Sequence, residues 1–327
     1  MSYTLRALFP ALCLTLILPC SPLVVAADPT PDKDAKPAEA PVERAALPSR
    51  TEEDTLALER QVPQVEQQQL QAGDEAFLAL WKPANVDEPK GAVIIVPGAD
   101  ESADWPTAVA PLRRKLPDVG WSSLSLSMPD AHNDGIFARA VDAPAAAGDG
   151  DKAKDAAAKA PDPAATAEAE AAAAAEQATA QAEIAKANAE KIFARIDSAV
   201  AFAQQNKARS IVLLGHGKGA YWAARYMSER PSPAVQRLVM VTAVDTGKET
   251  PSLMELLPTL KVPTADFVNK DRPVPRQQAQ DRLDASKRSK NARFTQVALS
   301  AIPGNPAMEQ DQLFRRVRGW LEGDAAK

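Results

Sequence analysis

One segment, SIVLLGHGKGAYWAARYM, constrains the fold of this chain more than any other. Its first part, residues 210–215, is a short apolar run of the kind that forms a buried strand. The part that follows the turn, residues 220–229, has the pattern of a helix, and only a glycine-rich turn separates the two. A strand that turns directly into a helix is typical of parallel sheets that are covered on both faces.

Other apolar runs repeat this alternation along the chain. Loosely alternating residues at 65–70 and 77–81 predict a hairpin that turns near Gly73 and Asp74. The pattern predicts an α/β fold, a three-layer sandwich with a mainly parallel central sheet and its ligands at the carboxyl ends of the strands. The expected strands are residues 92–96, 121–128, 210–215, 238–244 and 294–302, and the expected helices are residues 106–116, 164–205, 220–229 and 277–287.

The N-terminus has the pattern of a secretory signal peptide. Arg6 is its only charged residue, and an apolar run over residues 7–18 is shorter than the roughly 20 residues of a membrane span. Pro19 before Cys20 disfavours a lipoprotein site, which needs a small residue there. We therefore predict cleavage after Ala27 and a periplasmic or secreted protein without a membrane span in the mature chain.

Cysteine usage and charge exclude several classes of site and partner. Both cysteines, Cys13 and Cys20, lie in the signal segment, so the mature chain has no disulfide and no thiolate metal site. Removal of the first 27 of 327 residues leaves 300 and takes Arg6 with it, which changes the formal charge from −5 to −6. Such a chain has no basic excess, and no nucleic-acid partner is expected.

Two polar tracts divide the chain. Residues 28–61 lack apolar periodicity and are predicted to be a mobile, disordered leader. A second tract begins as a tether and becomes an Ala-rich helix, with Asp162 as its N-cap and Pro163 at its first position. An apolar stripe predicts that the later part of this helix packs on the domain; it consists of Ile192, Ile196, Ala199, Val200 and Ala203. The predicted organisation is a signal peptide at 1–27, the leader at 28–61, the first part of the domain at 62–140, a low-complexity insertion at 141–187 and the second part of the domain at 188–323.

The turn Gly215-His216-Gly217-Lys218-Gly219 has the frame of a nucleophile elbow, Gly-x-Ser-x-Gly, with Gly217 at the serine position. Three more segments accompany it: IIVPGADESADWP with its turn at Gly98, PLRRKLPDVGWSSLSLSMPD, and LFRRVRGWL near the C-terminus. Together they resemble the α/β-hydrolase superfamily, and more narrowly an uncharacterised family of exported proteins of Gram-negative bacteria. The resemblance covers about residues 62–140 and 190–322, and Pro97 stands where many relatives have histidine.

The resemblance implies a catalytic apparatus that this chain lacks. The nucleophile position is Gly217, and the loop after the last strand, AIPGNPAMEQ, has no histidine, although Asp271 could be the acid. Loss of the serine or the histidine of a catalytic triad costs on the order of a million-fold in turnover. We therefore predict a pseudo-hydrolase that binds or scaffolds in the cell envelope, with no cofactor and no metal. Its partner would be a small molecule or an envelope protein, bound at Gly98, Ala99, Gly217 and Lys218.

A second hypothesis is an atypical ester or amide hydrolase, with or without a metal. His216 would then be a base or a ligand, although a purely structural role beside the turn is favoured. His132 lies between Asp130 and Asp134 at the ligand edge and is the alternative base. These three residues also have the types that bind metals, with His216, Asp100 or Asp104 as further ligands, but their spacing alone is a weak signal.

Two further hypotheses remain open. Gly215-x-Gly217-x-x-Ala220, with Asp245 after the next strand, fits a loose dinucleotide fingerprint. The strand is at least the third of its sheet, which disfavours that interpretation. In the other hypothesis, the protein acts through the leader and the helix at residues 164–187, but an Ala-rich helix without a large apolar stripe is more often a solvated spacer.

Overall fold

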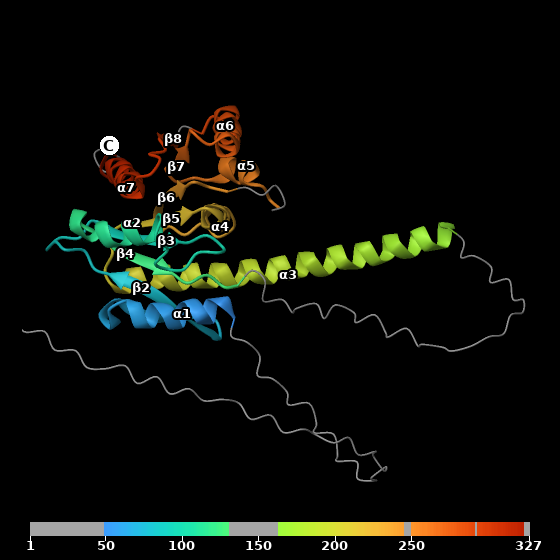
Figure 1. The fold of residues 1–327 in the computed structure, drawn as a ribbon, viewed down its shortest axis with the longest axis horizontal. Coiled ribbons are helices and arrows are strands. Elements are labelled where there is room, and N and C mark those ends of the chain that lie inside the picture. The colour runs from blue at the N-terminus through green and yellow to red at the C-terminus, as the bar shows by residue number, and fades with distance from the viewer. Residues whose placement is uncertain (1–48, 131–162, 245–249, 292, 324–327) are drawn as a thin grey trace, which may run out of the picture. The chain divides into compact units, whose positions relative to one another are not determined.

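The computed structural model of the protein describes residues 49–130, 163–244, 250–291 and 293–323, which all lie in a unit that spans Leu47–Lys327. Among these residues, eight strands form one sheet in the order β1-β2-β4-β3-β5-β6-β7-β8 (Figure 1). The hairpin β1–β2 and the pair β2–β4 are antiparallel, and the pairs from β4 through β8 are parallel. The strands are β1 (Gln67–Ala72), β2 (Glu75–Lys82), β3 (Gly91–Val96), β4 (Trp121–Leu126), β5 (Ile211–His216), β6 (Val235–Val241), β7 (Thr264–Asn269) and β8 (Phe294–Leu299).

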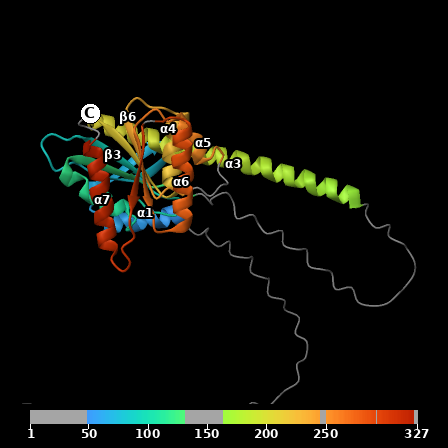
Figure 2. The same ribbon diagram turned by 90° about the horizontal axis from the view of Figure 1, so that it is seen from above.

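Helices cover both faces of this sheet, which confirms the predicted three-layer α/β fold (Figure 2). Alternate residues of a strand point to opposite faces, so Ile94 of β3 packs with α3, α4 and α5 while Ile95 packs with α2 and α7. The helices are α1 (Arg50–Gln61), α2 (Val109–Lys115), α3 (Pro163–Gln205), α4 (Lys218–Glu229), α5 (Leu253–Leu256), α6 (Pro273–Arg288) and α7 (Pro306–Gly323).

The long helix α3 begins at Pro163, as its sequence predicts. Residues 175–183 are exposed, and the first buried side chain of the described part is Ala189. The predicted apolar stripe, from Ile192 to Ala203, is buried in the core. Packing therefore starts at Ala189, three residues before the first branched side chain of the stripe. No helix in the described ranges is both long and apolar enough to cross a membrane, and this includes α3.

The prediction that the mobile leader extends to residue 61 is wrong, because α1 occupies its last part. Ser49 and Glu52 form a capping box that begins the helix, since each side chain accepts a hydrogen bond from the backbone N–H of the other. Leu58 and Val62 are buried in a small cluster with Leu78, Leu80 and Ala103. Residues 28–48 of the predicted leader lie outside the described residues.

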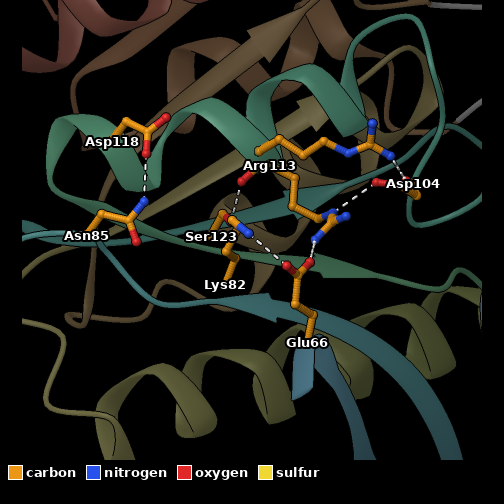
Figure 3. Close-up of polar contacts among 8 residues, drawn as sticks. Glu66, Lys82, Asn85, Asp104, Arg113, Asp118 and Ser123 are labelled. Carbon is orange, nitrogen blue, oxygen red and sulfur yellow. Dashed lines mark hydrogen bonds and ion pairs between the residues drawn. The ribbon is translucent and has the colours of Figure 1, made fainter. Parts of the chain in front are cut away.

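A buried arginine joins α2 to the start of the sheet (Figure 3). The side chain of Arg113 is 3% exposed, and it forms ion pairs with Glu66 and, at 2.9 Å, with Asp104. Lys82 of β2 donates to the same Glu66 carboxylate at 2.7 Å, and Ser123 donates to the carbonyl of Arg113 at 2.7 Å. Through these two ion pairs, Glu66 fixes the segment that precedes β1 to the rest of the domain.

Replacement of Glu66 by glutamine should remove a pH-dependent part of the stability. Burial raises the pKa of the Glu66 carboxyl, but hydrogen bonds and charges from Lys82 and Arg113 outweigh burial and lower it below its ordinary value of 4.5. The stabilisation is therefore present above about pH 4.5 and is lost as the pH falls through the lower, folded-state pKa. We expect Glu66→Gln to cost about 1–3 kcal/mol at pH 7 and less near pH 3 in urea unfolding. An equal cost at both pH values would contradict this, and Glu53→Gln on the exposed face of α1 is the control.

Candidate functional site

A cavity of about 420 Å³ lies at the carboxyl ends of β5, β6, β7 and β8. His216 and Gly217 line it from the end of β5, and residues 241–244 line it from the end of β6. Asn269, the last residue of β7, and Arg272 beyond it add polar groups to the wall. This is the edge at which parallel sheets place their ligands.

The turn after β5 has the strained strand-to-helix form of a nucleophile elbow. Gly217 has φ 56° and ψ −121°, a conformation that side-chain-bearing residues rarely adopt. Its N–H donates to Val241 at 3.0 Å, and its carbonyl accepts from Val244 at 3.1 Å. A Cβ built on Gly217 would meet no atom within 4 Å. The turn thus keeps its form and leaves open space at the serine position.

The two flanking glycines are required by close backbone contacts. A Cβ on Gly219 would lie 2.2 Å from the carbonyl oxygens of Val96 and Pro97, at the end of β3. A Cβ on Gly215 would lie 2.4 Å from the Cα of Ala220 in α4. These contacts hold α4 against the ends of β3 and β5, and they explain the Gly-x-x-x-Gly spacing physically.

Glu101 joins the loop after β3 to the elbow. Its Oε2 accepts the Gly98 N–H at 2.7 Å and lies 2.7 Å from Nδ1 of His216. The side chains of Glu101 and His216 are each 14% exposed, and both line the cavity. Because an ionised carboxylate can only accept, Nδ1 of His216 donates to it, and in a neutral ring Nε2 is left as an acceptor.

Because of this contact, the predicted oxyanion loop does not offer the Gly98 N–H to a ligand. The resemblance places a ligand-binding amide near Gly98 and Ala99, but the Gly98 N–H already donates to the protein's own carboxylate. Ala99 lines a separate small cavity beside α1, and Lys218 begins α4 without lining the cavity at Gly217. Of the four predicted ligand-binding residues, Gly217 is the one that lines the cavity at the carboxyl ends of β5 to β8.

The predicted acid, Asp271, contacts no histidine among the residues that the structure describes. Its carboxylate is exposed and accepts the Ala301 N–H at 2.7 Å, so it anchors the loop after β8. Within the described residues, the carboxylate beside His216 is that of Glu101. The acid position therefore has a structural role in this loop.

The described carboxylates of the metal hypothesis already have partners. Asp100 accepts from Arg50 at 2.8 Å, Asp104 accepts from Arg113 at 2.9 Å, and Asp130 accepts from Thr51 Oγ1 at 2.6 Å. The described part of the chain holds no group of three His, Cys, Asp or Glu side chains that could bind a metal ion. His132, Asp134 and Asp245 lie outside the described residues, so the hypotheses that use them stay predictions.

Glu101, Arg272 and Thr242 line the cavity and were not among the sequence predictions. Glu101 lies within the loop that was predicted to hold the oxyanion site, so the sequence did indicate this part of the cavity wall. Arg272, just before α6, forms no ion pair with any described residue and lines the cavity. Thr242 has φ 45°, which is rare for a β-branched residue, and its N–H donates to Phe267 at 2.8 Å. No sequence pattern indicates these last two positions.

The fold and the elbow together define an α/β-hydrolase-like protein, and solved structures support this class. An esterase from Pyrococcus furiosus matches with a TM-score of 0.51 and 13% identity, over 78% of this chain and 89% of its own. Est1E from Butyrivibrio proteoclasticus matches with a TM-score of 0.53 and 11% identity, over 80% and 100%. A putative dienelactone hydrolase from Klebsiella pneumoniae matches with a TM-score of 0.50 and 13% identity, over 78% and 96%. At these identities the likeness shows the fold alone, and it confirms the predicted α/β-hydrolase-like fold.

The family follows from the sequence match. The model of the family described as protein of unknown function, DUF3530, matches residues 9–323, and the chain belongs to this family. No curated protein matches the chain significantly in sequence.

Proposed function

We propose that this protein is an exported α/β-hydrolase-like protein that binds a small ligand beside Gly217 and does not hydrolyse it. The observation that carries the proposal is the elbow itself, which keeps its strained backbone around a residue without a side chain. Beside it lies a cavity of about 420 Å³, within the usual range for small-molecule sites.

Three parts of a serine hydrolase differ in this chain. The nucleophile position is Gly217, and the loop after β8 contains no histidine because both histidines of the chain, His132 and His216, precede it. The Gly98 amide binds Glu101 and is not free for an oxyanion. Loss of the nucleophile or the base alone removes on the order of a million-fold of the rate in such enzymes.

The place of action is part of the proposal. The N-terminal segment has the charge, the apolar run and the small residues of a secretory signal peptide. A role in the cell envelope follows from export, with the bound partner a small molecule or a ligand group carried by an envelope protein.

A second candidate function is supported by the contact between Glu101 and His216. A carboxylate that orients a histidine can make it a general base for water, provided that the free ring nitrogen reaches the water. The 2.7 Å contact and the position of both side chains in the cavity wall support such a dyad. In this alternative the protein would be a slow ester hydrolase without a covalent intermediate.

Hydrolysis of p-nitrophenyl butyrate by the purified protein distinguishes the two functions. We expect no turnover above background, with chelator or with added zinc, and no change in His216→Ala or Glu101→Gln. Gly217→Ser should also be inactive, since no histidine follows the last strand to activate the hydroxyl. Turnover that is lost in His216→Ala would overturn the binding proposal in favour of the dyad. Metal-dependent turnover that is lost in His132→Ala would favour the metal-assisted hydrolase.

A further inference from the structure

We propose that the ligand of this cavity carries a carboxylate on an apolar body, and that Arg272 binds the carboxylate. The inference rests on the proposed function, because it names the class of ligand for the same site. It depends on one arginine of the cavity wall that forms no ion pair with any residue that the structure describes.

The acidic groups of the cavity wall are satisfied within the protein. Glu101 accepts from the Gly98 N–H and from His216. Glu309, from the first turn of α7, accepts the Ile302 N–H at 2.7 Å. Each carboxylate therefore has an internal donor and does not require a cation from a ligand.

Arg272 is a cation of the cavity wall that has no ionic partner among the described residues. Arg272 precedes α6 and lines the cavity, and it makes no ion pair with any residue in the described ranges. Arg272 is exposed, so its side chain is accessible to a ligand from solvent. Guanidinium groups bind carboxylates in a bidentate manner, with two parallel hydrogen bonds.

The rest of the wall suits an apolar body. Val241, Ala243 and Val244 line the cavity from the end of β6, and Leu299 and Leu313 line it from β8 and α7. Val244 is 45% exposed, so an apolar group reaches it from solvent. Apolar walls with a few placed polar groups are typical of small-molecule sites. A short aliphatic or aromatic carboxylic acid matches both parts of this wall.

Isothermal titration calorimetry with acids and their neutral isosteres tests the inference. Hexanoate and benzoate are titrated into the purified protein beside hexanamide and benzamide, which have the same apolar bodies without the charge. We expect the acids to bind at least tenfold more tightly than the amides. Arg272→Gln should remove this preference, while Arg276→Gln, one turn further along α6, exposed and outside the cavity wall, should leave it unchanged.

A second variant tests the charge at the cavity without touching Arg272. Val244→Glu changes an exposed side chain, so the core stays intact, and it adds a negative charge to the wall. We expect it to weaken binding of the acids severalfold more than binding of the amides, because the amides lose only the apolar contact with Val244.

The outcomes separate this inference from the proposed function. Amides that bind as tightly as acids, or an unchanged preference in Arg272→Gln, would overturn the carboxylate anchor and leave ligand binding in the cavity intact. Absence of binding in both series would overturn the inference as well. Hydrolysis measured in the ester assay would overturn the proposed function whatever the preference for acids.

Discussion

Replacement of Asp266 by alanine is expected to lower the free energy of unfolding by about 3–5 kcal/mol, the cost of breaking a buried ion pair. Asp266 of β7 is fully buried, and its two oxygens accept from Nε and Nη2 of Arg282 at 2.9 and 3.2 Å. Gln296 of β8 donates to the same carboxylate at 3.1 Å. Without the carboxylate, a guanidinium that is 2% exposed would remain in the interior with its charge unpaired.

Urea unfolding at pH 7 measures this effect, and a double variant shows its origin. Asp266→Leu combined with Arg282→Met should recover at least half of the loss, because well-packed apolar residues often replace a buried ion pair at little cost. Asp281→Ala on the same helix, whose carboxylate accepts from Gln277 one turn away, should cost less than about 1 kcal/mol. A loss below about 1 kcal/mol in Asp266→Ala would contradict the structural role of the pair.

Gly219→Ala is expected to be the most damaging change in the elbow, at about 3 kcal/mol or more. The new Cβ would lie 2.2 Å from two backbone oxygens at the end of β3, and neither can move without shifting the strand. To remove the clash, α4 and the end of β3 would have to move apart. We expect a large loss of stability, or no folded protein at all.

Gly217→Ala is the matched control for this prediction. It adds the same methyl group two residues earlier, where a Cβ meets no atom within 4 Å. The remaining cost is the strain of a side chain at φ 56°, about 1–2 kcal/mol. In thermal and urea unfolding, Gly219→Ala should have a much lower melting temperature and a much lower free energy of unfolding than Gly217→Ala. The reverse order would mean that the elbow is not packed against β3 as described.

Much of the fold could be predicted from local patterns. The runs at 92–96 and 211–214 are apolar throughout, and they are buried in β3 and β5 because a parallel sheet buries both faces. The β1–β2 hairpin follows from alternation around Gly73, which has φ 63°. The start of α3 follows from the helix-forming composition after Pro163.

The site depended on contacts that local patterns do not contain. Glu101 and His216 are 115 positions apart in the chain, and the pairing of β3 with β5 brings them together. The helix α1 was missed because Leu58 is its one buried side chain in an otherwise polar segment. The role that we propose for Arg272 rests on the absence of an ion pair with any described residue, which a sequence cannot show.

The most direct test of the central claim observes binding and hydrolysis in the same tube. The ¹⁹F NMR spectrum of 4-fluorophenyl hexanoate reports both, because the ester signal broadens on binding and hydrolysis produces a separate 4-fluorophenol signal. We predict a broadened ester signal with the unmutated protein and no 4-fluorophenol above the protein-free rate. A 4-fluorophenol signal that grows with protein concentration and disappears in His216→Ala, or an ester signal that stays sharp, would contradict a cavity that binds without hydrolysing.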